Sequence, residues 1–228
     1  MESFSKTFTA WNRLQANLQL VGAKPAEMKA YLPFAHNPQK GFAFGTFEHN
    51  FTQAAFVRGD AAACLIIFEA EETKELFTLL VRQARSIVGR TNLLEMVAGV
   101  LDEDQIKIAE KILKEVQEET GQSFSSNDFF NLSNWQTLHA RNSIGYHPED
   151  ERTTCSLMSP GGLDEGITFF CVKKRLPLAE IKAMHGNVAG NSAEHEKTLV
   201  NILPIRDALF VCKDPKFLSA YALYSAYA

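Results

Sequence analysis

The sequence predicts an α/β protein with a smaller β-rich region at its N-terminus. Three observations favour this class. Strand-like and helical segments alternate without the regular repeat of a parallel barrel, one helical pattern dominates near residues 104–120, and an aromatic, partly alternating run lies nearer the N-terminus. With 228 residues, of which 46% are hydrophobic and 22% charged, the chain can form one main domain with a small appendage. We expect an N-terminal region over residues 1–57, with a helix, antiparallel strands and a role in dimerisation, and a main domain over residues 58–228.

Charge and cysteine content exclude several partners. The formal net charge is −4, so the chain lacks the basic character of proteins that bind nucleic acid. No segment is apolar for long enough to span a membrane, and the N-terminus lacks the basic start and apolar stretch of a secretory signal. The four cysteines show no metal-binding or secretory spacing. These features predict a cytoplasmic protein, and the hydroxyl residues of 3–9 leave a leader directed to an organelle as the alternative.

The first third of the chain is expected to hold a short helix, a loop-rich stretch and two strand pairs. Residues 5–20 have helical spacing, and the prolines that follow predict loops. The run Gly41–Val57 is aromatic and alternates in part, as antiparallel strands do. The apolar segments Ala61–Glu69 and Leu76–Arg82 flank an acidic turn, so they predict a core hairpin.

One amphipathic helix dominates the middle of the chain. Apolar residues recur on one face from about Asp104 to Thr120, and a glycine follows where the helix would end. Further strands are expected over Ile167–Val172 and Leu199–Ile202, and a closing helix over Lys216–Ala228. The polar stretch Asn134–Ser156 is expected to be a long inserted loop.

Three glutamates on this helix are the strongest chemical signal. At about 100° per residue, Glu115, Glu118 and Glu119 fall within an arc of roughly 100° beside the apolar stripe. Repulsion among close carboxylates raises their pKa values unless a cation neutralises them, and oxygen ligands suit Mg²⁺ or Mn²⁺. The alternative is a solvated acidic face, in which Lys111 and Lys114 pair with glutamates four residues further on.

The same segment resembles the box of the Nudix hydrolases, a glycine and a glutamate followed by R-E-U-x-E-E-x-G-U, where U is a bulky aliphatic residue. Gly99 is followed here by the run Lys114–Gly121, which reads KEVQEETG. Lys114 replaces the arginine, Gln122 replaces the last aliphatic residue, and the spacing from Gly99 is one residue longer. Gln105 is the nearest counterpart of the first glutamate. The resemblance implies a Nudix α/β/α sandwich with a mixed sheet.

The resemblance also implies roles for individual residues. Glu115 and Glu119 would be the principal Mg²⁺ ligands, and Glu118 would contribute through water or to a second ion. Ala98 would supply a backbone carbonyl to the metal. Glu95 would bind the metal or the substrate, or hold an arginine near the helix.

Other segments resemble the branch that hydrolyses ADP-ribose and ADP-sugars. The residues up to Arg85, with the strand expected over Leu93–Gly99, are similar to E-Q-x-R followed by L-L-E-x-V-A-G, so Arg85 would contact the substrate phosphates. The loop Ser159–Glu165 is similar to S-P-G-G-x-x-E. Glu165 would therefore be the general base, with Asp164 as the alternative.

The similarity extends to both ends of the main domain. Arg58 begins a segment similar to R-G-x-A-V, which implies a place in the substrate site, and the run Leu199–Leu209 resembles the final strand and helix of plant-type ADP-sugar diphosphatases. The resemblance spans roughly residues 41–228 and leaves residues 1–40 outside it.

These features together imply Mg²⁺-dependent hydrolysis of an ADP-sugar, ADP-ribose or ADP-glucose, to AMP and a sugar phosphate. Alternatives are hydrolysis of UDP- or GDP-sugars or of another dinucleotide, and a sensor that binds nucleotide sugars without cleaving them. Relatives in this branch are homodimers whose N-terminal strands reach the partner. The segment Gly41–Phe56 is the expected equivalent, because a lone hairpin could not cover its own rings.

Overall fold

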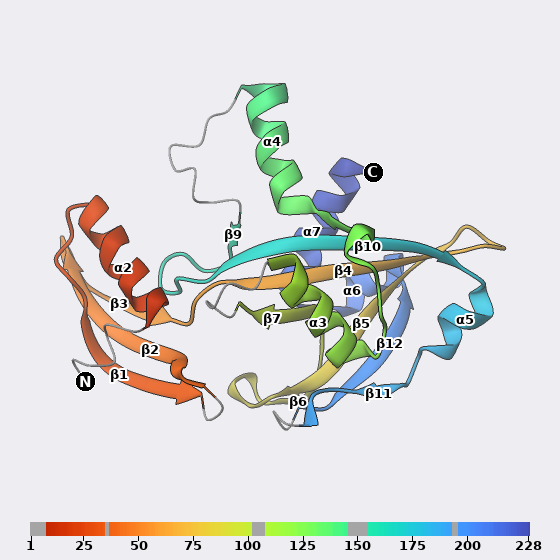
Figure 1. Cartoon of the computed structure of the whole chain (residues 1–228), viewed down its shortest axis with the longest axis horizontal. Helices are drawn as coiled ribbons and strands as arrows, with labels where there is room; N and C mark the ends of the chain where they lie inside the picture. The colour runs from red at the N-terminus through yellow and green to blue at the C-terminus, as the bar shows by residue number, and fades with distance from the viewer. Residues whose placement is uncertain (1–7, 35–36, 102–107, 146–154, 193–195) are drawn as a thin grey trace. The chain divides into compact units, whose positions relative to one another are not determined.

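A computed structural model gives the fold as two compact units (Figure 1). The structure describes residues 8–34, 37–101, 108–145, 155–192 and 196–228. The first unit comprises residues 1–61, 100–104 and 157–167, and the second comprises residues 62–99, 105–156 and 168–228. Within the described ranges, no helix combines the length and apolarity needed to cross a membrane. The domain boundary predicted after residue 57 stays a prediction.

The first unit contains a three-stranded antiparallel sheet and a helix packed on it. Its elements, with the strands in the order β1-β2-β3, are α2 (Thr9–Leu20), β1 (Glu27–Phe34), β2 (Asn37–His49) and β3 (Phe51–Val57). Residues from the helix side and alternate residues of the strands form its core: Phe8, Ala10, Trp11, Ala43, Ala55 and Val57. The predicted helix and the antiparallel strands over Gly41–Val57 are confirmed within the described residues.

The prediction of a loop-rich stretch around the prolines is wrong, because this stretch forms β1 and the start of β2. β1 lies at the edge of its sheet, where a missing N–H costs no ladder hydrogen bond. Pro33 lies in this strand, and the pairing with β2 shifts register directly after it. The edge position and the irregular register explain why a proline is compatible with a strand here.

The sheet face away from the core carries four large apolar side chains, which we call the outer patch. Leu32 pairs across the strands with Phe42. Phe44 pairs with Phe56 two residues further along β2, so both pairs lie on one face. Leu32, Phe44 and Phe56 are 66%, 43% and 40% exposed, which leaves this apolar face open to solvent.

The second unit is built on a sheet with the strand order β11-β12-β5-β4-β10-β8, and β6, β7 and β9 pair at its sides. The strands are β4 (Ala61–Ala70), β5 (Leu76–Arg85), β6 (Arg90–Glu95), β7 (Val97–Val100), β8 (Phe129–Asn131), β9 (Ser156–Leu157), β10 (Gly166–Leu176), β11 (Val188–Ala189) and β12 (Thr198–Pro204). β4 and β5 form the predicted antiparallel hairpin. Hydrogen bonds join the starts of β4 and β10, from Gly166 to Asp60, and their ends, from Glu71 to Leu176. These neighbours therefore run in the same direction, and the predicted α/β fold with a mixed sheet is confirmed.

Helices pack against this sheet, with α3 on the viewer's side of the strands and α6 and α7 behind them (Figure 1). The helices are α3 (Ile108–Thr120), α4 (Leu132–Ile144), α5 (Leu178–Ala183), α6 (Ile205–Val211) and α7 (Pro215–Tyr227). α3 ends as predicted at Gly121, which adopts φ 69° and donates its N–H to the carbonyl of Gln117. The part of the predicted helix before Ile108 lies outside the described residues, as does Gln105.

Two further expectations need correction. The stretch Asn134–Ser156 is not a loop throughout, because residues 134–144 lie in α4, whose N-terminus is capped by the Asn131 side chain. Residues 146–154 lie outside the described part. The strand expected over Leu93–Gly99 is divided into β6 and β7. Met96 separates them because its N–H donates to Asp214 Oδ2 (2.9 Å), which precedes α7.

Candidate active site

Helix α3 holds the three glutamates of the second unit at the boundary between core and solvent. Its apolar stripe buries Ile112 and Val116. Glu115 and Glu119 share that side of the helix and are only 9% and 3% exposed. Glu118 is less buried, with 26% of its side chain exposed. The helix therefore places two carboxylates inside the protein surface and the third at its edge.

Glu119 is the most unusual of the three. Burial raises its pKa well above the ordinary value of 4.5, and the charges of Glu115 and Glu196 raise it further. The charge of Arg85 and a hydrogen bond from the backbone N–H of Ala98 act in the opposite direction. Within the described residues, the Oε2 atom of Glu119 is buried and has no hydrogen-bond partner. Such an oxygen can accept a bond from a bound ion or an ordered water.

Glu115 lies against the backbone of Gly99, the glycine that begins the box-like segment. A Cβ atom on Gly99 would lie 2.2 Å from Cδ and 2.3 Å from Oε1 of Glu115, so no other residue fits without moving the carboxylate. Oε1 of Glu115 pairs with Lys111 Nζ at 2.6 Å, and the Lys111 side chain is only 12% exposed. Glycine is thus required at position 99 because the Glu115 side chain lies so close to its backbone. Lys111 balances the charge of Glu115.

Glu118 contacts the segment that precedes β12. Its Oε1 accepts a hydrogen bond from Asn191 Nδ2 (3.3 Å) and lies 3.5 Å from Lys114 Nζ. Its backbone carbonyl accepts the N–H of Gly190 (2.8 Å). Both lysine pairs of the alternative interpretation are therefore present, but the burial of Glu115 and Glu119 does not match a solvated acidic face.

The donor set fits a hard divalent cation in part. Carboxylate oxygens are the ligands that Mg²⁺ and Mn²⁺ prefer, and the unpartnered oxygen of Glu119 together with the cradle at Gly99 suits an oxygen-binding cation. No group of three or more acidic, histidine or cysteine side chains is arranged as a metal site among the described residues. Ala98 contributes its N–H to Glu119, and this hydrogen bond does not test the carbonyl ligand expected from the sequence. The residues that could hold a cation are thus Glu115 and Glu119, with Glu118 beside them.

Arg85 and Glu95 form an ion pair on the neighbouring strands β5 and β6. Arg85 Nε lies 2.7 Å from Glu95 Oε2; the Arg85 side chain is 45% exposed, whereas that of Glu95 is 9% exposed. Of the roles expected for Glu95, namely binding the metal, binding the substrate or holding an arginine, this ion pair matches the last, with Arg85 as the arginine. The arginine keeps an exposed cationic group in an acidic protein, which a phosphate-bearing ligand requires.

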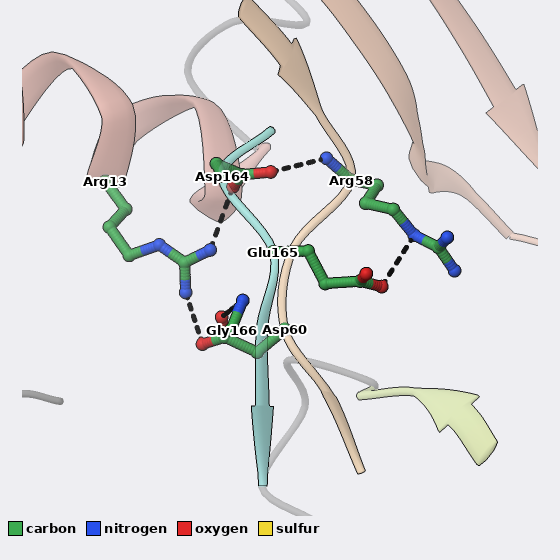
Figure 2. A network of polar contacts seen from close by, with 6 residues as sticks. All are labelled: Arg13, Arg58, Asp60, Asp164, Glu165 and Gly166. Atoms are coloured by element: carbon green, nitrogen blue, oxygen red, sulfur yellow. Dashed lines mark hydrogen bonds and ion pairs between the residues drawn. The ribbon is translucent and has the colours of Figure 1, made fainter. Parts of the chain in front are cut away.

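The first unit holds a separate ion-pair network between the start of β4 and the loop before β10. Arg13 of α2 pairs with Asp60 through Nη1 and with Asp164 through Nη2, the latter at 2.9 Å. Figure 2 shows its guanidinium between the two carboxylates. The second oxygen of Asp60 accepts the N–H of Gly166 (3.0 Å), and the second oxygen of Asp164 accepts the N–H of Arg58 (2.9 Å).

Glu165, the expected general base, lies in this network. Its Oε1 lies 3.1 Å from Arg58 Nε, and 9% of its side chain is exposed (Figure 2). This contact is an ion pair without hydrogen-bond geometry, because the buried Arg58 Nε has no hydrogen-bond partner among the described residues. The Arg58 guanidinium also lies over the ring of Phe42, 5.7 Å from its centroid, and Phe42 stacks on Phe56. The structure therefore brings together Arg58, Glu165 and Asp164 in one unit, and Glu115, Glu118 and Glu119 in the other.

Sequence reasoning missed four participants: Arg13, Asp60, Asn191 and Glu196. Arg13 lies in the segment that no motif covers, and its partners follow 47 and 151 residues later. No local pattern could have found it. Asn191 and Glu196 lie in the segment before β12, and only the fold brings them to Glu118 and Glu119.

Comparison with known proteins finds similarity to a Nudix hydrolase and to a solved hydrolase structure. No model of a known family matches the chain. It is similar to Nudix hydrolase 14, chloroplastic, of Arabidopsis thaliana, with 30% identity over 169 residues, which are 74% of this chain and 50% of the relative. The chain thus spans about half the length of this relative. A solved structure described as an ADP compounds hydrolase superposes with a TM-score of 0.48 and 15% identity, over 89% of this chain and 93% of that chain.

Proposed function

Because the chain belongs to the Nudix hydrolase superfamily, we propose that it hydrolyses the pyrophosphate bond of an ADP-sugar, ADP-ribose or ADP-glucose, to AMP and a sugar phosphate. The observation that carries this proposal is the buried Glu119, whose Oε2 has no partner within the described residues. Glu115 lies one helical turn away against Gly99. The ADP-sugar substrate rests on the E-Q-x-R-like and S-P-G-G-like segments of the sequence.

We assign Glu115 and Glu119 as the principal ligands of Mg²⁺ or Mn²⁺, with Glu118 assisting and Ala98 as a possible carbonyl donor in the bound state. When bound there, such a cation would neutralise charge on the pyrophosphate and would favour attack by water. Glu119 supplies the oxygen that lacks a partner, and Glu115 is held in place by the missing side chain at Gly99. In the absence of a cation, Lys111 balances the charge of Glu115.

Three more residues have proposed roles toward the substrate. Arg85 binds its phosphates, and Glu95 orients Arg85 through their 2.7 Å ion pair. Glu165 is the proposed general base that accepts a proton from water. Arg58 holds the carboxylate of Glu165 and is itself a candidate for substrate binding.

The outer patch supports a homodimer as the proposed assembly. Its occupant would be the same patch of a second copy, because twofold symmetry brings identical surfaces together. The exposed rings of Phe44 and Phe56 would then be buried. Light scattering at micromolar concentration should give twice the chain mass, and Phe44→Asp should give a monomer. A wild-type monomer with full activity would contradict the dimer.

The cytoplasmic location expected from the sequence stays a prediction. The name of the relative places that protein in the chloroplast, so a leader directed to an organelle remains the alternative. Expression of the full chain with a C-terminal fluorescent tag would separate the two locations.

A substrate panel tests the proposed function. Mg²⁺-dependent release of nucleoside monophosphate would be measured with ADP-ribose, ADP-glucose, UDP-glucose, GDP-mannose and NADH, each repeated with EDTA. The expected result is AMP release from an ADP-sugar with the highest kcat/KM, abolished by EDTA. Faster release of UMP or GMP would favour the alternative substrates. Tight binding without cleavage of any compound would favour the nucleotide-sugar sensor.

A further inference from the structure

Glu165 lies between two residues that are each hydrogen-bonded to a distant part of the first unit. On one side, Asp164 accepts the N–H of Arg58 (2.9 Å). On the other side, Gly166 donates its N–H to Asp60 (3.0 Å). The backbone that carries Glu165 is therefore held directly before and directly after this residue. Both bonds use an aspartate carboxylate. Asp164 lies in the S-P-G-G-like loop and Asp60 in the R-G-x-A-V-like segment, each at a position that the motif leaves open.

Arg13 is the group that fixes both carboxylates. Its Nη1 pairs with Asp60 and its Nη2 with Asp164, so a single guanidinium joins the start of β4 to the loop before β10 (Figure 2). Without a cation between them, the two carboxylates would face only backbone N–H groups, and each would be freer to leave its partner. Arginine suits this place because its planar fork can bond two acceptors at once, which a lysine ammonium does less well.

We propose that Arg13 is a positioning residue, which holds Glu165 in its working orientation through Asp60 and Asp164. This inference rests on the proposed function, in which Glu165 is the general base. Arg13 itself does not act on the substrate, because both of its η nitrogens are engaged by the two carboxylates. Helix α2, which lies outside the segment that resembles Nudix hydrolases, thereby becomes part of the catalytic apparatus.

Backbone hydrogen bonds to β3 also hold the loop before Glu165. Phe56 donates its N–H to Gly162 (2.8 Å) and accepts the N–H of Asp164 (3.3 Å). These bonds hold the loop next to β3, but the loop contains two adjacent glycines, which give its backbone wide conformational freedom. Backbone bonds alone do not set the direction of the Glu165 side chain. The ion pairs of Arg13 with the two aspartates, and of Arg58 with Glu165, set this direction.

The test compares Arg13→Met and Arg13→Lys with the wild type. Arg13→Met keeps much of the aliphatic stem and removes the fork, so kcat should fall about 10- to 100-fold, a part of what a general base contributes. KM and the affinity for Mg²⁺ should stay within about twofold, because substrate and metal lose no contact. Arg13→Lys should be intermediate, since one ammonium can satisfy only part of the fork. Lys24→Met is the matched control, because it removes a cation from an exposed ion pair of the same unit and should leave kcat unchanged.

A second measurement separates positioning from a loss of stability. Amide hydrogen exchange should be about tenfold faster in Arg13→Met at Arg58 and Gly166, whose N–H groups bond to the two aspartates, and unchanged in the core strands. In a Glu165→Gln background, the kcat penalty of Arg13→Met should disappear, because there is no base left to position. The same exchange comparison applies to Arg13→Lys should the methionine variant fail to fold.

The outcomes distinguish the two levels of the proposal. If Glu165→Gln keeps wild-type kcat, the base assignment fails and the role of Arg13 falls with it. If Glu165→Gln is inactive but Arg13→Met matches the wild type in kcat, the proposed function stands and the positioning role of Arg13 is overturned. An Arg13→Met penalty that persists in the Glu165→Gln background also overturns it, because the effect then does not pass through Glu165.

Discussion

The glutamate helix of the second unit and the ion-pair network of the first unit differ in how completely their buried carboxylates are paired. On the helix, a buried carboxylate is left with one oxygen unpartnered among the described residues, and burial raises the pKa of Glu119. In the network, both oxygens of Asp60 and both oxygens of Asp164 have partners. Among the described residues, the helix leaves one buried carboxylate oxygen without a hydrogen-bond partner, whereas the network gives every oxygen of its two aspartates a partner.

This difference separates a region suited to ligand binding from a region that stabilises one backbone geometry. A buried charge without a partner reduces stability, so its presence indicates a ligand that supplies the missing charge. A set of acids and arginines with matched partners stabilises one geometry and needs no ligand to do so. On this argument we propose that a cation binds at the helix and that the network holds a loop in place. Each of the following changes tests one side of that contrast.

The largest effect is expected from Glu119→Gln. The amide keeps the size of the side chain but removes the charge that a divalent cation requires, so kcat should fall about a thousandfold at saturating Mg²⁺. Glu110→Gln is the matched control, because Glu110 is an exposed glutamate on the same helix and should keep normal activity. Steady-state release of AMP from the best substrate of the panel measures both. Near-normal turnover in Glu119→Gln would remove the helix from the active site.

Gly99→Ala should have the next largest effect. The new Cβ would lie 2.3 Å from Oε1 of Glu115, so the carboxylate must move by an ångström or so, a displacement that can cost about a hundredfold in rate. The fold should also lose about 1–3 kcal/mol from overpacking. In a Glu115→Ala background the Cβ has space, and the stability loss from Gly99→Ala should largely vanish. An equal loss in both backgrounds would show that Glu115 does not require the glycine.

The stability of the two regions should respond with opposite signs. In metal-free buffer, Glu119→Gln should raise the free energy of unfolding by about 0.5–2 kcal/mol, because a buried charge is lost. Asp164→Asn should lower the free energy of unfolding by about 1–3 kcal/mol, because the Asp164 side chain is only 8% exposed and would lose its ion pair with Arg13.

The gain from Glu119→Gln should depend on pH. The folded-state pKa of Glu119 lies above its ordinary value of 4.5, so in the wild type the folded chain binds this proton more tightly than the unfolded chain. The wild type therefore loses stability as the pH rises above about 4.5 and regains it below. The gain should be present at neutral pH and disappear in acid. Urea unfolding at several pH values measures it, and a gain that is equal at all pH values would contradict the charge explanation.

Sequence predicted the helix well and the network hardly at all, for physical reasons. The apolar period of α3 and the glycine after it are local signals, so the helix end and the face shared by Glu115 and Glu119 followed from spacing. The network depends on contacts between distant segments, such as Arg13 with Asp164, which no local pattern records. β1 was missed because prolines normally interrupt strands, and only its edge position makes Pro33 acceptable.

The smallest effect is expected from Lys114→Arg, which restores the arginine of the Nudix box. Lys114 is 56% exposed and its Nζ lies 3.5 Å from Glu118, so the pair is a surface interaction of little energetic weight. The free energy of unfolding should change by less than about 0.5 kcal/mol, and kcat should stay within about twofold. Lys111→Arg is the contrasting variant on the same helix. Its side chain is only 12% exposed beside Glu115, so the larger guanidinium should cost about 1–3 kcal/mol. Inactivation by Lys114→Arg would mean that this side chain faces the interior of the site. The contrast between a solvated Lys114 and a buried Lys111 would then be wrong.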